Sequence, residues 1–315
     1  MWSGTDVIID ERTGDGGSKR PRVIKFGGTS VTRGDRIDTI AAVVSDRFRT
    51  SRPVVVVSAF AQVTTLLERA ALAARSGEHG EVFGQIRAIH DAAVRSMTDS
   101  ASTVSATVGH LLTECAHLLD RIASVGECSP ETLDEILAFG ERLSSTIITY
   151  GLVGRGVAAC AIDAADLMVT DANCSDARAD LEATRRRLHA VLPAQPAVPI
   201  VTGFIGATPA GVRTTLGREG SDYSAAVLAW GLRAEAVEIW TDVDGIMTAD
   251  PRVVTDARPL RHLTYDELLE LTSWGAKVIH PKTVRPLRDL GIVLTVRNTL
   301  APEDPGTRVG PAGRR

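Results

Sequence analysis

Apolar residues along this chain follow two alternating patterns. Short runs rich in valine and isoleucine are typical of buried strands, and between them apolar residues recur at helical spacing. Strands are predicted at residues 22–26, 53–58, 157–162, 201–206, 236–242 and 292–297. The main helices are predicted at residues 35–49, 81–125 with a break near 98–102, 130–151, 181–192, 223–232 and 265–272. This alternation predicts an α/β fold, a three-layer α/β/α sandwich with a mainly parallel central sheet.

The two ends of the chain lack these patterns. Residues 1–20 are polar and glycine-rich, and residues 301–315 contain three prolines and three glycines. Neither stretch offers enough apolar residues to form a packed element. We therefore expect a disordered leader over residues 1–20, one domain over residues 21–300 and a disordered tail over residues 301–315.

The composition limits the classes of function. The 315 residues carry a formal net charge of −4 and 4% aromatic residues, whereas nucleic-acid-binding proteins usually have a basic surplus and stacking aromatics. No apolar run approaches the length of a membrane span, and the amino terminus has no signal-peptide pattern. The four cysteines form no C-x-x-C pair. We therefore predict a soluble cytoplasmic protein with no nucleic-acid or membrane partner.

Residues 201–252 contain the strongest chemical signal: a strand, a glycine-rich loop, a helix, a second strand and an acidic loop. This order predicts a βαβ unit, which places both loops at the carboxyl edge of a parallel sheet, where such sheets bind ligands. The first loop offers groups for an anion at a helix N-terminus: Gly217, Arg218, Gly220, Ser221 and Asp222. The second loop offers Asp242, Asp244, Asp250 and Arg252. Together the two loops predict a nucleotide and phosphoryl-transfer site.

Lys25 lies at the end of the first apolar strand, directly before Phe26, Gly27 and Gly28. A buried ammonium group is costly unless it has an anionic partner. The side chain either extends to the surface or points at a phosphate that the glycines allow the backbone to approach, and we favour the second interpretation. The chain contains neither a Walker A motif nor a G-x-G-x-x-G motif.

Other polar residues leave alternatives open. Ser58 and Thr64 follow the second strand, where a hydroxyl group is either a cap or a ligand. Glu141 lies at the border of the apolar face of the helix over residues 130–151, so it is either solvated or directed at a ligand. His110 and His117 are predicted to be structural or surface residues, because no carboxylate or cysteine completes a metal set. The metal ligands stay unassigned.

These residues belong to motifs that, taken together, resemble the aspartate kinase catalytic domain of the amino-acid kinase superfamily. The motifs are Lys25–Val31, Val57–Ala59 with Thr64, Phe139–Ser145, Gly203–Ala207, Thr214–Arg218, Gly220–Ser224, Trp240–Gly245, Thr248–Arg252 and Gly275–Pro281. Nine motifs in the family's order make the resemblance specific. It implies phosphorylation of the β-carboxylate of L-aspartate to 4-phospho-L-aspartate with ATP and Mg²⁺, the first step toward lysine, threonine and methionine. It also implies an amino-acid-binding lobe at about residues 21–195 and an ATP-binding lobe at about residues 196–300.

The resemblance implies a role for each matching residue. The catalytic residues would be Lys25, Arg218 and Asp222, with Gly27 and Gly28 facing the transferring phosphoryl group. The amino acid would be held by Ser58, Thr64, Glu141, Arg218, Gly220, Ser221 and Asp222. ATP would be held by Lys25, Phe26, Gly27, Gly28, Thr241, Asp242, Met247, Arg252, Lys277 and Val278. The chemistry suits this set, because a β-carboxylate with a reference pKa of about 3.9 is already ionised and needs no general base.

Three positions differ from the family's pattern. Glu219 stands where a small or neutral residue is common, Phe60–Gln62 replaces a smaller segment, and Met247 stands where a tyrosine is common. Because the first two concern the amino-acid side, the acceptor is either L-aspartate or a close analogue used in specialised metabolism. An alternative of another class is a non-catalytic regulatory subunit.

The sequence ends at Arg315, whereas most aspartate kinases continue into paired ACT regulatory domains. We therefore expect the chain to lack the usual feedback site for lysine or threonine. The resemblance leaves a homodimer open as the oligomeric state.

Overall fold

A computed structural model describes residues 19–32, 34–98, 101–192, 197–249, 253–273 and 279–312. The strands are β1 (Pro21–Phe26), β2 (Arg52–Val57), β3 (Ala159–Ile162), β4 (Val198–Thr202), β5 (Ile205–Ala207), β6 (Arg213–Thr215), β7 (Ala236–Thr241), β8 (His262–Thr264), β9 (Val293–Asn298) and β10 (Thr307–Gly310). The helices are α1 (Gly28–Val31), α2 (Ile37–Thr50), α3 (Val63–Ala74), α4 (Gly80–Met97), α5 (Ala101–Val125), α6 (Pro130–Val153), α7 (Leu181–Val191), α8 (Gly220–Leu232), α9 (Tyr265–Ser273) and α10 (Pro281–Leu290), with short 3₁₀ turns at Gly34–Arg36 and Ala164–Asp166.

The main sheet has the spatial order β3-β4-β2-β1-β7-β9-β10-β8. Neighbours from β3 to β9 are parallel, whereas β10 is antiparallel to β9 and parallel to β8. The central strand β1 therefore ends beside the carboxyl ends of β2 and β7. Parallel strands that end together form the ligand-binding edge of such sheets, so this register sets the position of the candidate site.

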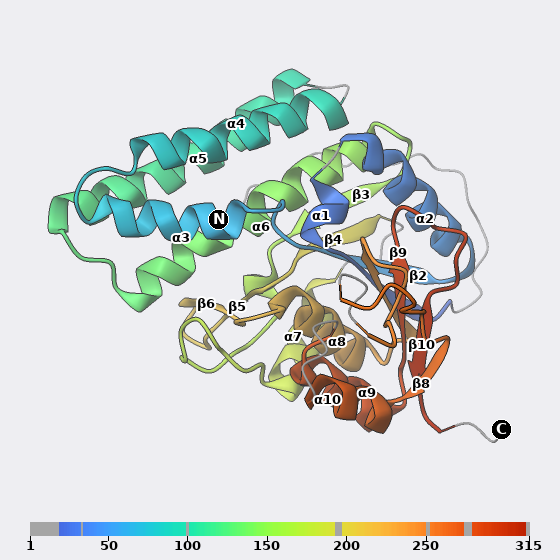
Figure 1. Cartoon of the computed structure of the whole chain (residues 1–315). Helices are drawn as coiled ribbons and strands as arrows, with labels where there is room; N and C mark the ends of the chain where they lie inside the picture. Colours follow the sequence, from blue (N-terminus) through green and yellow to red (C-terminus); the bar gives the residue numbers. More distant parts are fainter. Residues whose placement is uncertain are drawn as a thin grey trace.

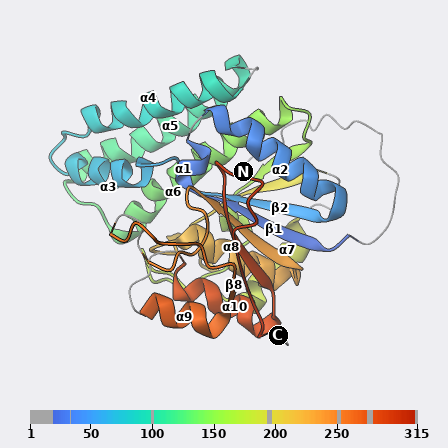
Figure 2. The same cartoon turned by 45° about the vertical axis from the view of Figure 1, so that its right-hand side comes forward.

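Alternate residues of each central strand enter different cores. In β1, Ile24 and Phe26 belong to the apolar cluster with α2–α6, whereas Val23 belongs to the cluster with α7–α10. Figure 2 shows these two groups of helices on opposite faces of the sheet, and Figure 1 shows α3, α4 and α5 projecting beyond it. The predicted three-layer α/β/α sandwich with a mainly parallel sheet is confirmed. No helix in the described part of the chain combines the length and apolar composition that a bilayer crossing requires.

The prediction of a disordered tail over residues 301–315 is wrong for its described part. Residues 307–310 form β10, which pairs with β9 and β8, and Val309 is completely buried. A strand of four residues between prolines and glycines carries too little periodicity to be recognised in the sequence. The predicted leader over residues 1–20 lies outside the described residues, apart from Lys19 and Arg20. The division into two lobes stays a prediction.

The glycine-rich loop of the βαβ unit also differs from its prediction. The strand expected at residues 201–206 is divided, because β4 ends at Thr202 and β5 begins after Phe204, which has a left-handed backbone with φ 65°. The segment that follows is a hairpin, in which β5 pairs with β6. Helix α8 begins at Gly220, so Gly220, Ser221 and Asp222 form its first turn.

Candidate active site

Lys25 occupies the end of the central strand and points away from solvent. Its neighbours Ile24 and Phe26 face the α2–α6 core, so the Lys25 side chain faces α8 on the other side of the sheet. Its Nζ lies 2.5 Å from Oδ1 of Asp222 in the first turn of α8, and the two side chains are 11% and 7% exposed. The anionic partner that a buried ammonium requires is therefore part of the protein.

The backbone after Lys25 leaves no room for a side chain at Gly28. A Cβ atom on Gly28 would lie 2.7 Å from the carbonyl oxygen of Ala59, closer than side-chain atoms approach a backbone. The amide of Gly27 donates to the carbonyl of Trp240 at 2.9 Å and so ties this turn to the end of β7. Phe26 is completely buried and stacks on Trp240, so only its backbone lies along the candidate site.

Glu141 lies in the middle of α6 and is 3% exposed. Its Oε1 accepts a hydrogen bond from the amide of Ala59 at 3.0 Å, whereas its buried Oε2 has no hydrogen-bond partner among the described residues. Burial raises the pKa of this carboxyl group to about 8, against the opposing effects of the Ala59 amide and the Lys25 charge. The structure thus rules out a solvated border charge, one of the two alternatives that the sequence left open.

A buried carboxylate supports the loop that carries Arg218. Asp134 on α6 accepts hydrogen bonds from the amide and the hydroxyl of Thr215 at 2.9 and 2.8 Å, and from the amide of Ser175 at 3.1 Å. Arg218 follows shortly after Thr215, is exposed and makes no hydrogen bond or ion pair with any described residue. A guanidinium on a supported loop, without a partner of its own, is available to an anionic ligand.

Ser58 and Thr64 lie at the carboxyl end of β2, the strand next to β1. The amide of Ser58 donates to the carbonyl of Phe26 at 3.2 Å, and the carbonyl of Ser58 accepts from the Ser144 hydroxyl at 2.7 Å. Thr64 lies in the first turn of α3 and is partly exposed. The fold thus brings both residues to the predicted edge, with their hydroxyl groups unused in hydrogen bonds among the described residues.

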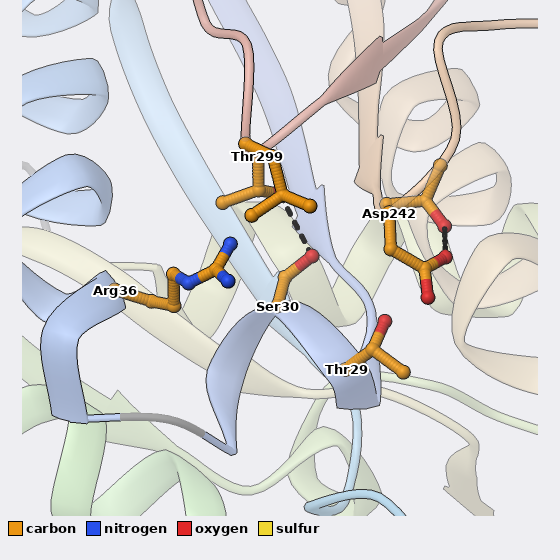
Figure 3. A pocket seen from close by; sticks show the side chains of 7 residues that line it. Thr29, Ser30, Arg36, Asp242 and Thr299 are labelled. Atoms are coloured by element: carbon orange, nitrogen blue, oxygen red, sulfur yellow. Dashed lines mark hydrogen bonds between the residues drawn. The ribbon is translucent and has the colours of Figure 1, made fainter.

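A cavity of about 210 Å³ opens at the carboxyl ends of β7 and β9. It is lined by Thr29, Ser30, Arg36, Thr241, Asp242, Thr299 and Leu300. The hydroxyls of Ser30 and Thr299 form a 2.7 Å hydrogen bond, with Arg36 on one side of this pair and Asp242 on the other (Figure 3). The sequence predicted Thr241 and Asp242 here but gave no sign of Arg36, because nothing local shows that the turn after α1 faces the end of β9.

The structure describes only some of the other residues that were predicted to bind the nucleotide. Met247 is partly exposed and forms an isolated bridge with Pro259 in the loop after β7. Arg252, Lys277 and Val278 lie outside the described residues. Within the described part of the chain, no group of three histidine, cysteine, aspartate or glutamate residues is arranged to hold a metal ion.

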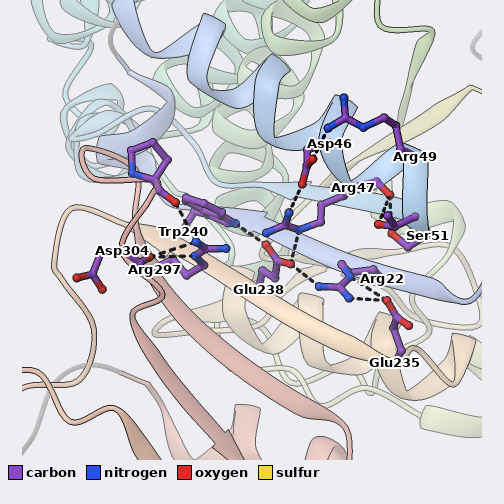
Figure 4. A network of polar contacts seen from close by, with 12 residues as sticks. Arg22, Asp46, Arg47, Arg49, Ser51, Glu235, Glu238, Trp240, Arg297 and Asp304 are labelled. Carbon is purple, nitrogen blue, oxygen red and sulfur yellow. Dashed lines mark hydrogen bonds and ion pairs between the residues drawn. The ribbon is translucent and has the colours of Figure 1, made fainter.

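A second charged cluster lies on the other face of the sheet and was missed by the sequence interpretation (Figure 4). Glu238 of β7 accepts hydrogen bonds from Nη1 of Arg22 at 2.6 Å and Nε of Arg47 at 2.7 Å through Oε1, and from Nε1 of Trp240 at 3.1 Å through Oε2. The Arg297 guanidinium lies 4.7 Å from the Trp240 ring. The signal in the sequence was one carboxylate inside an otherwise apolar strand.

Comparisons with known proteins identify the family of this chain. The model of the amino acid kinase family matches residues 20–298. Aspartokinase 1, chloroplastic, of Arabidopsis thaliana is 36% identical over 295 residues, which cover 90% of this chain and 51% of that protein. The bifunctional aspartokinase/homoserine dehydrogenase of Haemophilus influenzae is 33% identical, over 91% of this chain and 36% of its own length. The chain therefore spans about half the length of the first relative and about a third of the second.

A solved structure gives the same result. The crystal structure of E. coli aspartokinase III in complex with aspartate and ADP superposes with a TM-score of 0.87 at 34% identity. The match covers 93% of this chain and 65% of that one.

Proposed function

This chain belongs to the amino acid kinase family, as its motifs predicted, and from this premise we propose that it transfers the γ-phosphoryl group of ATP to the β-carboxylate of L-aspartate. The observation that carries the proposal is the buried Lys25 ammonium at the end of the central strand, beside a turn that has no room for a side chain at Gly28. The aspartate and ADP in the similar E. coli protein support the choice of both substrates.

The proposed reaction needs positioning and charge neutralisation rather than a base. An oxygen of the ionised carboxylate forms a bond to the γ-phosphorus, while the bond from that phosphorus to the β,γ-bridging oxygen breaks and ADP leaves with the electron pair. Lys25 is proposed to neutralise charge on the transferring group, and the absence of a side chain at Gly28 is proposed to let the backbone approach that group. No cysteine or histidine is required, because the nucleophile is already ionised.

The acceptor is proposed to lie between α6, the start of α3 and the first turn of α8. The Arg218 guanidinium, which has no partner in the described part of the chain, suits the α-carboxylate of the acceptor. Glu141 has a buried oxygen without a hydrogen-bond partner among the described residues, and it is proposed to receive the α-ammonium group together with Asp222, whose Oδ1 also pairs with Lys25. Ser58, Thr64, Gly220 and Ser221 are proposed to complete this side of the site.

The nucleotide is proposed to lie over the ends of β7 and β9, where Thr241 and Asp242 line the cavity with Arg36. Mg²⁺ is proposed to bind with the nucleotide, because it keeps most of its ligands as phosphate oxygens and waters and needs only one or two carboxylates. Asp242, the carboxylate among the residues that line this cavity, fits that mode of binding, and the described residues contain no cluster of three or more metal ligands. When bound, the ion would supply charge neutralisation at the phosphates.

Hydroxylamine trapping tests the proposed activity. The purified chain with ATP, Mg²⁺ and L-aspartate should yield aspartyl hydroxamate, and Lys25→Met should lower the rate by about 10²- to 10³-fold, as for loss of a group that stabilises transition-state charge. Lys19→Met, which removes an exposed lysine just before the same strand, is the matched control and should behave like the wild type. A wild-type rate no higher than that of Lys25→Met would reject the proposal.

Two other functions remain as competing hypotheses. A kinase acting on an aspartate analogue is motivated by Glu219 and Phe60–Gln62, and it would be favoured if an analogue were a better substrate than aspartate. A regulatory subunit would neither bind ATP nor form hydroxamate, which calorimetry with ATP would detect. The cytoplasmic location and the homodimer stay predictions.

A further inference from the structure

Asp134 of α6 is a completely buried carboxylate that joins two distant segments, the strand β6 and the loop before α7. Its Oδ2 accepts hydrogen bonds from the amides of Thr215 and Ser175 at 2.9 and 3.1 Å. Its Oδ1 accepts from the hydroxyls of Thr215 and Ser175 at 2.8 and 3.2 Å. It forms no ion pair within the described part of the chain. Because a buried carboxylate is costly without such donors, these bonds hold both segments in one arrangement.

The two segments enclose the turn that leads to Arg218. Thr215 ends β6, and the amide of Ala177 donates to its carbonyl at 2.9 Å. Gly217 turns in the left-handed region with φ 77°, and a Cβ atom on it would lie 3.0 Å from the carbonyl oxygen of Ser175. The turn is therefore bounded by β6 on one side and by residues 175–177 on the other, and one carboxylate holds both.

The same helix carries Glu141. Asp134 and Glu141 both lie on α6, two helical turns apart, so they share nearly the same face at a spacing of about 10.5 Å along the axis. Glu141 is proposed to receive the α-ammonium group of the acceptor, and Arg218 its α-carboxylate. One helix thus carries the first group directly and supports the turn that presents the second. Such support fixes the distance between the two groups before the ligand arrives.

We propose that Asp134 is a positioning residue for the acceptor: through Thr215 and Ser175 it holds Arg218 at a set distance from Glu141. The inference rests on the proposed function and deepens it, because this distance selects a ligand whose ammonium and carboxylate groups share one carbon. Asp134 does not touch the acceptor, since it is completely buried and protein donors occupy both its oxygens. Without it, Arg218 would keep its charge but would have to be ordered by the ligand, which weakens binding.

The test measures the preference for L-aspartate over its α-amide, L-isoasparagine. This analogue keeps the β-carboxylate and the α-ammonium group but lacks the charge of the α-carboxylate. The wild type should favour L-aspartate by about tenfold or more, both in KM and in dissociation constants from calorimetry without ATP, as expected for a hydrogen bond between charged groups. Asp134→Asn should raise the KM for L-aspartate by about tenfold, because one of its two polar atoms no longer accepts. The KM for the α-amide, the KM for ATP and kcat should each change by less than about twofold, since the effect is confined to ordering Arg218.

A double-mutant cycle with Arg218→Met separates positioning from a general structural role. If Asp134 acts through Arg218, Asp134→Asn should change the KM for L-aspartate by no more than about twofold once Arg218 is replaced. Thr215→Val is a milder variant for the case in which Asp134→Asn does not fold, because it keeps the shape of the side chain and removes only one donor to Asp134. It should reduce the preference for L-aspartate in the same direction.

Glu135→Gln is the matched control, because Glu135 also joins α6 to β6, through Nε of Arg213 at 3.1 Å. Arg213 keeps its hydrogen bonds to Asp163, so this variant should leave the preference and every KM unchanged. An unchanged preference in Thr215→Val and in folded Asp134→Asn, or an equal rise in KM with and without Arg218, would overturn the inference. If the acceptors bind but are not phosphorylated, only the proposed function fails, and the dissociation constants decide the role of Asp134. If L-aspartate does not bind, both are wrong.

Discussion

Glu238 and Glu141 are both almost completely buried, at 2% and 3% exposure, but their surroundings shift the pKa of the carboxyl group in opposite directions. Burial alone would raise the pKa of Glu238, but the hydrogen bonds and charges of Arg47 and Arg22 outweigh it and lower the pKa. Glu141 has one backbone donor and a more distant lysine, so burial prevails and its pKa rises to about 8. Figure 4 shows Glu238 enclosed by its partners.

The difference separates a structural cluster from a site. Both oxygens of Glu238 are paired, and its partners join β1, α2 and β7 into one unit behind the turn at Gly27. Near Lys25, Oε2 of Glu141 has no hydrogen-bond partner among the described residues, and the proposed amino-acid acceptor would bring a donor for it. A fully paired buried network fixes one arrangement of the chain, whereas an incompletely paired one retains capacity to bind.

The largest effect is expected from breaking the paired cluster. Glu238→Gln should lower the free energy of unfolding by about 3 kcal/mol, because removing one partner of a buried ion pair leaves uncompensated charge. Arg22 would keep Glu235 and Arg47 would keep Asp46, which limits the loss. Urea denaturation at pH 7 measures the change, and the activity of the folded protein should stay near the wild-type level.

Glu235→Gln is the control for this change. Glu235 pairs with the same arginine but is 30% exposed, and exposed ion pairs contribute at most about 1 kcal/mol. If Glu238→Gln lost no more stability than Glu235→Gln, the cluster would not be the structural unit described above.

The opposite pattern is expected for Glu141. Glu141→Gln should change the stability by less than about 1 kcal/mol, because the amide resembles the protonated carboxyl group that it replaces. The KM for the amino-acid acceptor should rise by about 30-fold, which corresponds to about 2 kcal/mol for a hydrogen bond to a charged group. Steady-state kinetics with each substrate varied in turn separates this effect from any change in the KM for ATP.

Glu131→Gln provides the comparison on the same helix, since Glu131 is exposed in the first turn of α6. It should leave both KM values unchanged. A normal acceptor KM in Glu141→Gln would remove Glu141 from the site.

These two glutamates also show how far the sequence alone leads. The order of strands and helices, Lys25 before its glycines and the Arg218–Asp222 loop were recognisable because each has a local pattern. The environments of Glu141 and Glu238 could not be predicted, because they depend on residues about 80 or more positions away. These residues are Ala59 for Glu141, and Arg22 and Arg47 for Glu238. Ionisation inside a fold is set by such distant partners, which local periodicity does not contain.

The sequence prediction missed the shortest strands of the fold. The strand β10 and the β5–β6 hairpin have three or four residues per strand, so their apolar alternation is too brief to distinguish from a loop. Pairing with existing strands stabilises them, and that pairing is a tertiary property. For a similar reason, the start of α8 was predicted at residue 223 rather than at Gly220. Glu219 has a left-handed backbone conformation that no local sequence pattern indicates.

The smallest predicted effect is a change in acceptor affinity with pH. Because burial holds the pKa of Glu141 at about 8, most of this group is protonated at pH 7 in the free protein, and it must release its proton to bind an ammonium group. Acceptor affinity should therefore rise by up to about tenfold per pH unit between pH 6 and 8 and then level off. Calorimetry in two buffers of different ionisation enthalpy should detect close to one proton released per acceptor at pH 7, and Glu141→Gln should abolish both effects. Affinity that falls with rising pH, or binding without proton release, would show that Glu141 is already ionised and that its surroundings resemble those of Glu238.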